Sequence, residues 1–215
     1  MSTVVIAHTS ISTSGTNLAT TAPIDTTGAN AIYMFGYSVF GVGPPTDSKG
    51  NVWTDDGDLD STCNGGAGFT RCFNPVVGTG HTFSVTGNAS FTTQLLVLAL
   101  RVQNPGSFLN IRANSQVNPV QCSIPITAPV DNLVLVSCAV AGCGWTSLTV
   151  DSGFTIIEQQ PNIGMAYLIG AISTSINPTW TTLTSGGIGG STGGVVLESM
   201  GVFIPTGGNW QVYEA

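Results

Sequence analysis

Short runs in which apolar and polar residues alternate dominate this chain, and they limit what it can fold into. The apolar members are mostly β-branched or aromatic, and each run ends near glycine, proline, asparagine or aspartate, which terminate strands and form turns. No stretch has apolar residues at the three- and four-residue spacing of an amphipathic helix. The sequence therefore predicts strands over Thr3–His8, Ala31–Val42, Asn51–Thr54, Phe69–Phe73, His81–Thr86, Thr92–Val102, Phe108–Arg112, Leu133–Ala141, Phe154–Gln159, Gly164–Ile172, Thr179–Leu183 and Gly194–Ile204.

Tight turns are expected to join these strands. The segments Asp47–Asn51, Thr86–Asn88 and Asp151–Gly153 each supply a residue that tolerates positive φ. The chain has 215 residues, and β-sandwiches commonly reach roughly 200–250 residues as single units. We predict an all-β, antiparallel β-sandwich that forms one domain over residues 1–215.

The two halves of the chain resemble each other. The apolar run Ile32–Phe35 recurs as Val134–Ser137, at an offset of 102 residues, and the Asp47-Ser48 turn recurs as Asp151-Ser152. No linker or change of composition separates the two copies. We predict one sandwich made by an internal duplication of about 100 residues. Its parts are two pseudo-repeats, a crossing segment and a C-terminal tail: 20–102, 122–204, 103–119 and 205–215.

Charged side chains are scarce, which narrows the classes of partner. They make up 7% of the residues, and the formal net charge is −7, whereas about 25% of an average soluble domain is charged. Without a basic stripe that displaces phosphate counterions, we expect no nucleic-acid binding. No apolar run approaches the ~18 residues that span a bilayer, so we expect no membrane partner. The first residues also lack the basic leader and long apolar stretch of a secretory signal.

Five cysteines are present, and none has the C-x-x-C spacing of a zinc or redox site. An odd number cannot pair fully within one chain, so we expect mostly free thiols. Cys63 and Cys72 flank a glycine-rich turn, as do Cys138 and Cys143. A hairpin disulfide in either place stays open as an alternative.

Catalytic motifs are weak in this sequence. Residues 189–193 match G-x-S-x-G, the nucleophile elbow, but the strand-to-helix context that this motif needs is missing. His8 and His81 lie in predicted strands and have no carboxylate at a fixed spacing. We expect His81 to be a hydrogen-bonded strand residue close to Phe83. The chain is therefore predicted to have no catalytic residues and no enzymatic activity.

One acidic cluster stands out. Asp56, Asp58 and Asp60 imitate the start of an EF-hand calcium loop, but Ser61 stands where that loop needs glycine and Ala67 where it needs glutamate. Two interpretations stay open: a solvated acidic loop, or a looser surface calcium site. Calcium is the one cofactor that the sequence leaves open.

The four tryptophans divide by their surroundings. Trp53 and Trp180 lie in strand-like runs, and we expect them in the core. Trp145 and Trp210 follow glycine-rich segments, so we expect both to be exposed and to contact a protein partner or a glycan.

Several short motifs occur in an order that resembles a known group of proteins. They are Asp-Ser-Lys-Gly-Asn-Val-Trp-Thr at 47–54, Arg-Cys-Phe-Asn-Pro at 71–75, Gly-His-Thr-Phe at 80–83, and a long apolar strand that ends at Val102. Over most of residues 20–204 the chain is similar to the jelly-roll β-sandwich proteins of tailed bacteriophages and of some bacterial surfaces. The cysteine count and the acidic cluster depart from that pattern.

The resemblance implies a virion structural role. We expect a capsid decoration or cement protein that binds neighbouring subunits of the major capsid protein and copies of itself, as a dimer or trimer. Terminal segments, Thr3–His8 or Gly208–Ala215, are expected to lie against a neighbouring chain. The protein would be made in the host cytoplasm and reside on the virion surface. The alternative is a glycan-binding adhesin or fibre module for host-cell attachment, with Trp145 or the acidic cluster contacting the sugar.

Overall fold

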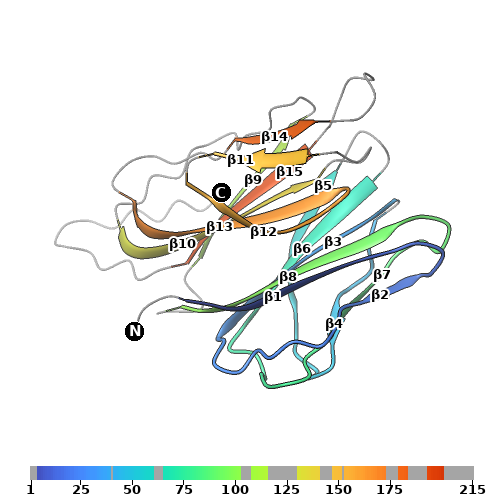
Figure 1. Cartoon of the computed structure of the whole chain (residues 1–215), viewed down its shortest axis with the longest axis horizontal. Helices are drawn as coiled ribbons and strands as arrows, with labels where there is room; N and C mark the ends of the chain where they lie inside the picture. Colours follow the sequence, from blue (N-terminus) through green and yellow to red (C-terminus); the bar gives the residue numbers. More distant parts are fainter. Residues whose placement is uncertain are drawn as a thin grey trace.

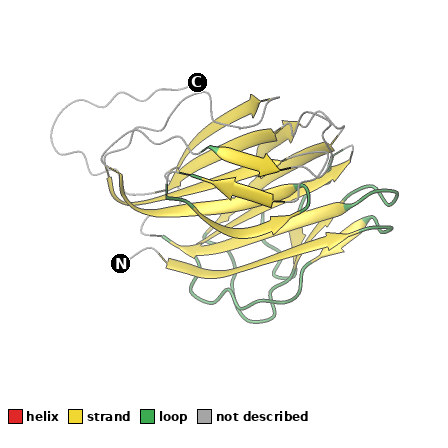
Figure 2. Ribbon diagram, turned by 45° about the horizontal axis from the view of Figure 1, so that its top comes forward, coloured by secondary structure: helices red, strands yellow, loops and turns green. Residues whose placement is uncertain are grey.

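The chain is an all-β protein with antiparallel sheets (Figure 1). The computed structural model describes residues 4–39, 41–60, 65–102, 108–115, 130–140, 147–151, 153–172, 179–183 and 193–200. Every regular element in these ranges is a strand, as Figure 2 shows. Within the same ranges, no helix has the length and apolar character needed to cross a bilayer. The prediction of an all-β, antiparallel fold is confirmed.

The first half of the chain forms a five-stranded sheet in the order β1-β8-β3-β6-β5. Its strands are β1 (Val4–Thr13), β3 (Ala31–Val39), β5 (Thr54–Asp60), β6 (Gly65–Phe73) and β8 (Thr93–Arg101). All residues from Leu95 to Leu100 are apolar and buried. A continuous apolar run of this kind is what a strand covered on both faces requires.

A small sheet covers the outer face of the first sheet. Its strands, in the order β2-β7-β4, are β2 (Leu18–Thr20), β7 (Phe83–Thr86) and β4 (Thr46–Asp47). Phe83 and Val85 of β7 share a buried cluster with Met34 of β3 and Val97 of β8. Burying a side chain of this size contributes about 1.5–3 kcal/mol, so the cluster holds the small sheet in place.

The second half forms another five-stranded sheet, in the order β12-β13-β10-β15-β9. Its strands are β9 (Phe108–Ser115), β10 (Val130–Val140), β12 (Thr155–Gln160), β13 (Ile163–Ile172) and β15 (Gly193–Met200). A two-stranded sheet of β11 (Ser147–Val150) and β14 (Trp180–Leu183) lies on the side away from the first sheet (Figure 1).

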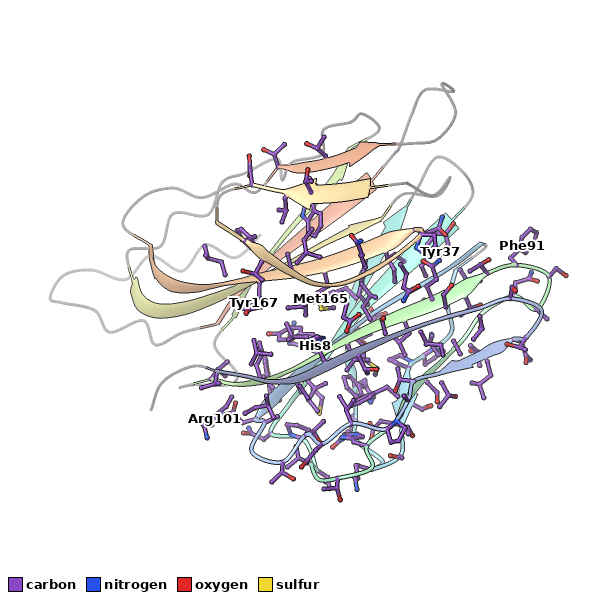
Figure 3. The ribbon with its side chains drawn as sticks, viewed as in Figure 1. His8, Tyr37, Phe91, Arg101, Met165 and Tyr167 are labelled. Atoms are coloured by element: carbon purple, nitrogen blue, oxygen red, sulfur yellow. The ribbon has the colours of Figure 1, made fainter. Side chains whose placement is uncertain are left out.

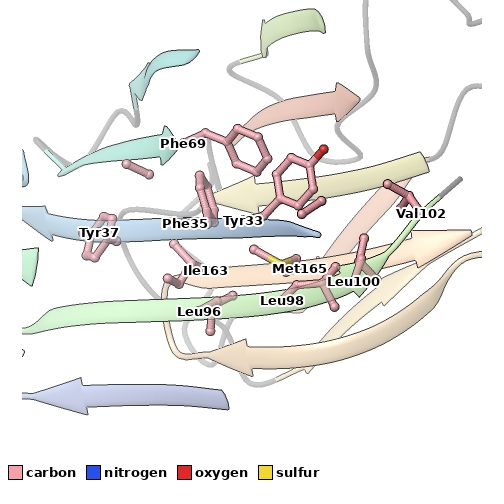
Figure 4. Close-up of a cluster of buried hydrophobic side chains, with 12 residues drawn as sticks. Tyr33, Phe35, Tyr37, Phe69, Leu96, Leu98, Leu100, Val102, Ile163 and Met165 are labelled. Carbon is pink, nitrogen blue, oxygen red and sulfur yellow. The ribbon is translucent and has the colours of Figure 1, made fainter. Parts of the chain in front are cut away.

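The two five-stranded sheets stack face to face, and the main core lies between them (Figure 4). Leu96, Leu98 and Leu100 of β8 share this core with Ile163 and Met165 of β13, and all five side chains are fully buried. Figure 3 shows Met165 on the side of β13 that faces the first sheet. The described strands therefore form four layers, with the small sheets outside.

Polar side chains also tie the two large sheets together, close to where β1 lies against β12. The Gln94 amide donates to Asn162 Oδ1 at 3.1 Å, and its Oε1 accepts the backbone N–H of Asn162 at 3.1 Å. Gln160 Nε2 donates to Ser10 Oγ at 2.9 Å. These bonds satisfy polar groups that the stacking would otherwise bury unpaired.

Most of the predicted strands form, with shifted ends. The strands β2, β4 and β11 were missed, and the three residues of β2 and two of β4 are too few to show alternation. The prediction for Asn51–Thr54 is wrong, because β5 begins at Thr54 and continues through the acidic residues to Asp60. The predicted crossing segment 103–119 contains β9, which pairs with β15 at the edge of the second sheet. The predicted tail, 205–215, lies outside the described residues.

Candidate functional site

The carboxylate of Asp47 collects hydrogen bonds from several segments of the chain. Asp47 ends β4, and the following turn passes through Gly50, where φ is +74°. Its Oδ1 accepts the backbone N–H of Lys49 at 2.7 Å and the side-chain amide of Asn51 at 3.2 Å. Its Oδ2 accepts the indole N–H of Trp53 at 2.8 Å. An aspartate that accepts the N–H two residues further on forms an Asx-turn, and here the same carboxylate also anchors an aromatic ring.

His81 approaches this carboxylate from a different loop. Its Nε2 lies 3.0 Å from Asp47 Oδ1, and both side chains are fully buried. Its Nδ1 lies 2.9 Å from Thr26 Oγ1, and its ring stacks on Phe83 with 4.2 Å between centroids. Because a carboxylate can only accept, Nε2 carries a proton, and in the neutral imidazole Nδ1 then accepts from the Thr26 hydroxyl.

Thr26, His81 and Asp47 therefore form a chain of hydroxyl, imidazole and carboxylate, the groups that a hydrolase triad contains. The Thr26 hydroxyl is closed to a substrate, because Thr26 has no exposed surface. Its Oγ1 also accepts the backbone N–H of Gly78 at 3.1 Å. A nucleophile must reach its substrate, so these groups serve to join the loops that carry them.

Burial and hydrogen bonding act on the two ionisable groups together. Burial lowers the pKa of His81, and the neighbouring Asp47 carboxylate offsets this only in part. Burial by itself would raise the pKa of Asp47, but hydrogen bonds from Lys49, His81 and Trp53 stabilise the anion and bring its pKa below the ordinary value. Near neutral pH the pair is therefore a neutral imidazole that donates to a carboxylate.

Asn51 extends this network to the neighbouring loop. Its Nδ2 donates to the carbonyl oxygen of Val76 at 3.1 Å, and its Oδ1 accepts the backbone N–H of Val76 at 2.6 Å. Apolar side chains project from the two braced loops: Val52 is 86% exposed and Val76 is 61% exposed. Exposed apolar side chains on pre-organised loops are suited to contact another protein.

A groove of about 340 Å³ opens on the outer face of the first sheet. Its lining comes from β3, β6, β7 and β8 and from the segments 42–45 and 51–55. Trp53 and Asn51 of the Asp47 network contribute to it, together with Asp55 and Thr70. Thr70 is 6% exposed, and its Oγ1 has no hydrogen-bond partner. The volume is within the range of small-ligand sites.

Comparisons of the chain with protein-family models, with curated proteins and with solved structures find no match. The functional interpretation therefore rests on the residues themselves. The motifs at 47–54 and 80–83, which carry the resemblance to phage jelly-roll proteins, are the segments that build the Asp47 network.

The residues predicted to bind calcium lie on β5. Asp56, Asp58 and Asp60 belong to an edge strand, not to a loop, and a bulge interrupts its pairing with β6 between Asp55 and Asp58. Their side chains lie outside the described part of the structure, so the calcium site stays a prediction. Among the side chains that are described, no cluster of histidine, cysteine or acidic groups is arranged to hold a metal.

The tryptophans are divided between core and groove. Trp180 is fully buried, which confirms its predicted core position. Trp53 is half-buried and lines the groove. Trp145 and Trp210, the predicted contact residues, lie outside the described residues, as does Ser191 of the G-x-S-x-G match. Their roles stay predictions.

Cys72 is a free thiol and is 7% exposed. Burial and the Asp47 carboxylate raise its pKa, so it behaves as a small apolar residue and not as a nucleophile. The prediction of a free thiol is confirmed for Cys72, and the alternative bond to Cys63 is not formed. The side chains of Cys138 and Cys143 lie outside the described residues.

The sequence pattern missed the carboxylate partners of both histidines. His81 bonds to Asp47, 34 residues away, and His8 Nδ1 lies 2.6 Å from Glu158 Oε1, 150 residues away. Pairs this distant leave no local spacing in the sequence. The prediction that His81 is hydrogen-bonded and close to Phe83 is confirmed.

Proposed function

We propose that this chain is a structural protein of a phage virion, a decoration or cement protein that binds neighbouring subunits on the capsid surface. The proposal includes a fold assignment: two jelly-roll units, one in each half of the chain and related by internal duplication, in place of the single jelly-roll sandwich that the sequence predicts. Such a protein acts by binding the assembled capsid more strongly than its separate subunits, with no chemical step.

Strand pairing in the first half supports the jelly-roll assignment. A jelly roll is a long antiparallel hairpin wrapped on itself, in which the first strand pairs with the eighth, the second with the seventh and the third with the sixth. Here β1 pairs with β8, β2 with β7 and β3 with β6. The fourth pair differs, since β5 pairs with β6 and β4 with β7. Viral capsid and lectin domains share this architecture.

Strand order in the second half supports the duplication. The first sheet runs β1-β8-β3-β6-β5, and the second, taken from its other edge, runs β9-β15-β10-β13-β12. Matched by position, β10 corresponds to β3, as the recurrence of Ile32–Phe35 at Val134–Ser137 predicts. β15 corresponds to β8. β9 then corresponds to β1. Each unit would therefore start earlier than the predicted pseudo-repeats, and most of the crossing segment would belong to the second unit.

The functional proposal rests on one observation: the groups of the Asp47 network are bonded to one another inside the protein, while apolar side chains of the same loops are exposed. Asp47, His81 and Thr26, which could support chemistry, are buried and bonded to one another. Val52 and Val76 remain on the surface of the braced loops. Exposed apolar side chains on loops that hydrogen bonds brace favour binding to another protein.

The contact surface in this proposal differs from the one that the sequence predicts. β1 pairs with β8 of the same chain along one edge only, because it is the edge strand of the first sheet, so the predicted contact of Thr3–His8 with a neighbouring chain stays a prediction. The loops that carry Val52 and Val76 are the described surface that we assign to the capsid partner.

Co-sedimentation with capsids of the source phage tests the proposal. The purified protein should bind stoichiometrically, and the pair Val52→Asp with Val76→Asp should weaken binding at least tenfold, because charges are unfavourable at the centre of an interface. The matched control pair, Leu18→Asp with Phe91→Asp, alters side chains that are 50% and 39% exposed elsewhere in the first half. Failure of the parent protein to bind capsids, or equal weakening by both pairs, would count against the proposal.

A second function, a glycan-binding adhesin or fibre module, is favoured by the groove at Trp53. Its lining combines an aromatic ring with carboxylate, amide and hydroxyl groups, a set that sugar recognition uses. Binding to host cells in place of capsids would support this function.

A further inference from the structure

We propose that the groove beside Trp53 binds a neutral sugar ring. The site is distinct from Trp145, the position at which the sequence predicts a glycan contact. It is assembled from the Asp47 network on one side and the first sheet on the other. The inference stands on this lining and holds whether or not the chain binds capsids.

The Trp53 indole is held in a fixed orientation. Its Nε1 donates to Asp47 Oδ2 at 2.8 Å, and its ring meets Phe83 edge-on, with 6.3 Å between centroids and 77° between planes. Stacking the C–H face of a sugar on this ring would bury apolar surface on both partners. Because the ring is already ordered, binding loses little conformational freedom.

Thr70 supplies the polar group in the lining that can pair with a sugar hydroxyl. The Asn51 amide is fixed by its two bonds to Val76, so this part of the wall is rigid. Thr70 lines the groove, and its buried Oγ1 has no partner. Leaving a buried hydroxyl unpaired is unfavourable. A sugar hydroxyl bound in the groove would supply the partner that the Thr70 hydroxyl lacks.

Glycines keep the groove open. Gly36, Gly43 and Gly68 contribute to its lining in place of larger residues. A Cβ added to Gly36 would lie 3.4 Å from a methyl group of Val85 and 3.6 Å from one of Val42. Alanine at position 36 is therefore accommodated by ordinary contacts, and its methyl group takes up groove volume.

The negative charge of the protein disfavours acidic sugars. Asp55 is the charged residue among the described residues of the groove. Lys49, close by in sequence, directs its Nζ to the carbonyl oxygen of Thr79 at 3.1 Å. The net charge of −7 disfavours binding of sialic or uronic acids, and a carboxylate in the lining favours hydroxyl-rich rings, since charged acceptors form the stronger hydrogen bonds.

The test is a titration of the whole chain with methyl pyranosides of glucose, galactose, mannose and N-acetylglucosamine, and with methyl sialoside for comparison. Binding is followed by the NMR signal of the Trp53 indole N–H, assigned with Trp53→Phe. We expect at least one neutral pyranoside to shift this signal saturably, and the sialoside to leave it unchanged.

Matched variants locate the site. Thr70→Val keeps the side-chain size and should weaken binding about three- to tenfold, and Gly36→Ala should weaken it by narrowing the groove. Thr155→Val, on the exposed surface of β12, and Trp145→Ala should bind as the parent does. If Gly36→Ala fails to fold, Thr70→Val still decides the question.

Two outcomes overturn the inference: no pyranoside shifts the Trp53 signal, or binding survives both groove variants and is lost in Trp145→Ala. These outcomes are separable from those of the capsid experiment. If the protein binds capsids but no sugar, only the decoration proposal is supported. If it binds a sugar but not capsids, only the sugar site in the groove is supported.

Discussion

His81 and Asp47 are joined by a hydrogen bond of 3.0 Å between Nε2 and Oδ1, and neither side chain has any exposed surface. The bond connects the turn after β4 with the segment that leads into β7. Thr26 adds a third segment through the other ring nitrogen of His81. One buried imidazole and one carboxylate therefore hold together the loops at this end of the first half.

Replacing Asp47 with alanine should destabilise the fold by about 3 kcal/mol or more, because it leaves the buried donors of His81 and Trp53 unpaired. Urea denaturation should show a lower midpoint at an unchanged m value. Asp25→Ala is the control, since Asp25 is exposed and accepts the backbone N–H of Thr27 at 2.9 Å, and it should leave the stability close to that of the parent. Equal stability of the parent and the Asp47 variant would contradict the role given to the network.

The free energy of unfolding should decrease as pH decreases, because of the lowered pKa of His81. The folded-state pKa of His81 lies below its ordinary value of 6.5, so as pH decreases below about 6.5 the unfolded chain takes up a proton that the folded chain does not. Stability is then lost by up to about 1.4 kcal/mol per pH unit until the folded pKa is reached. Above pH 6.5 this group makes no pH-dependent contribution. Asp47 acts in the same sense at lower pH: its contribution is present above the ordinary pKa of 3.8 and is lost as pH falls through the depressed folded pKa.

Urea denaturation at a series of pH values from about 8 to about 5 measures the pH dependence of the free energy of unfolding. The His8→Gln background leaves His81 as the remaining histidine, since the chain has two. In that background, His81→Gln should remove the loss of stability between about pH 6.5 and pH 5. A slope that survives this substitution would assign the effect to other groups.

Gly50 should tolerate asparagine better than alanine. Its φ of +74° lies in the left-handed region, and a Cβ there would meet no neighbouring atom within 4 Å. The cost of Gly50→Ala is therefore backbone strain alone, about 1–2 kcal/mol, and Gly50→Asn should cost less because asparagine enters this region more readily. Thermal unfolding of the two variants gives the comparison, and equal losses would show that the turn relaxes.

Met165→Ala should destabilise both halves of the chain together. Met165 belongs to the second half but is buried against β8 of the first half, and removing a methionine from a core costs about 2–5 kcal/mol. Because the two large sheets share this core, the indole NMR signals of Trp53 and Trp180 should be lost in one urea transition. Two separate transitions would mean that the halves fold independently.

The sequence pattern predicted the strands whose signal is local. The apolar run Leu95–Leu100 predicts β8, because a strand covered on both faces needs apolar residues at consecutive positions. β4 is two residues long and gives no such signal. β5 is an edge strand rich in acidic residues, and it is defined by its pairing with β6 more than by its own side chains.

Only part of the candidate site could be predicted from the sequence. The turn chemistry of Asp47–Asn51 was visible, because an aspartate and a glycine at this spacing form a tight turn. Its bonds to His81 and Trp53, and the groove that Trp53 lines, depend on how distant strands pack. Packing of this kind leaves no fixed spacing in the sequence.

Thr70→Val should separate binding from stability. The Thr70 hydroxyl is buried and unpaired, so replacing it with a methyl group of similar size removes an unsatisfied polar group and fills the same space. The free energy of unfolding should stay unchanged or rise by about 1 kcal/mol, measured by urea denaturation, while affinity for a neutral pyranoside falls. Thr26→Val is the contrasting change, since the Thr26 hydroxyl bonds to both His81 and Gly78, and it should lower stability. A polar group that weakens the fold where it stands is retained most readily when it has a role in binding. Loss of stability in Thr70→Val would instead mean that the hydroxyl already has a structural partner, and the argument for a ligand at this position would fail.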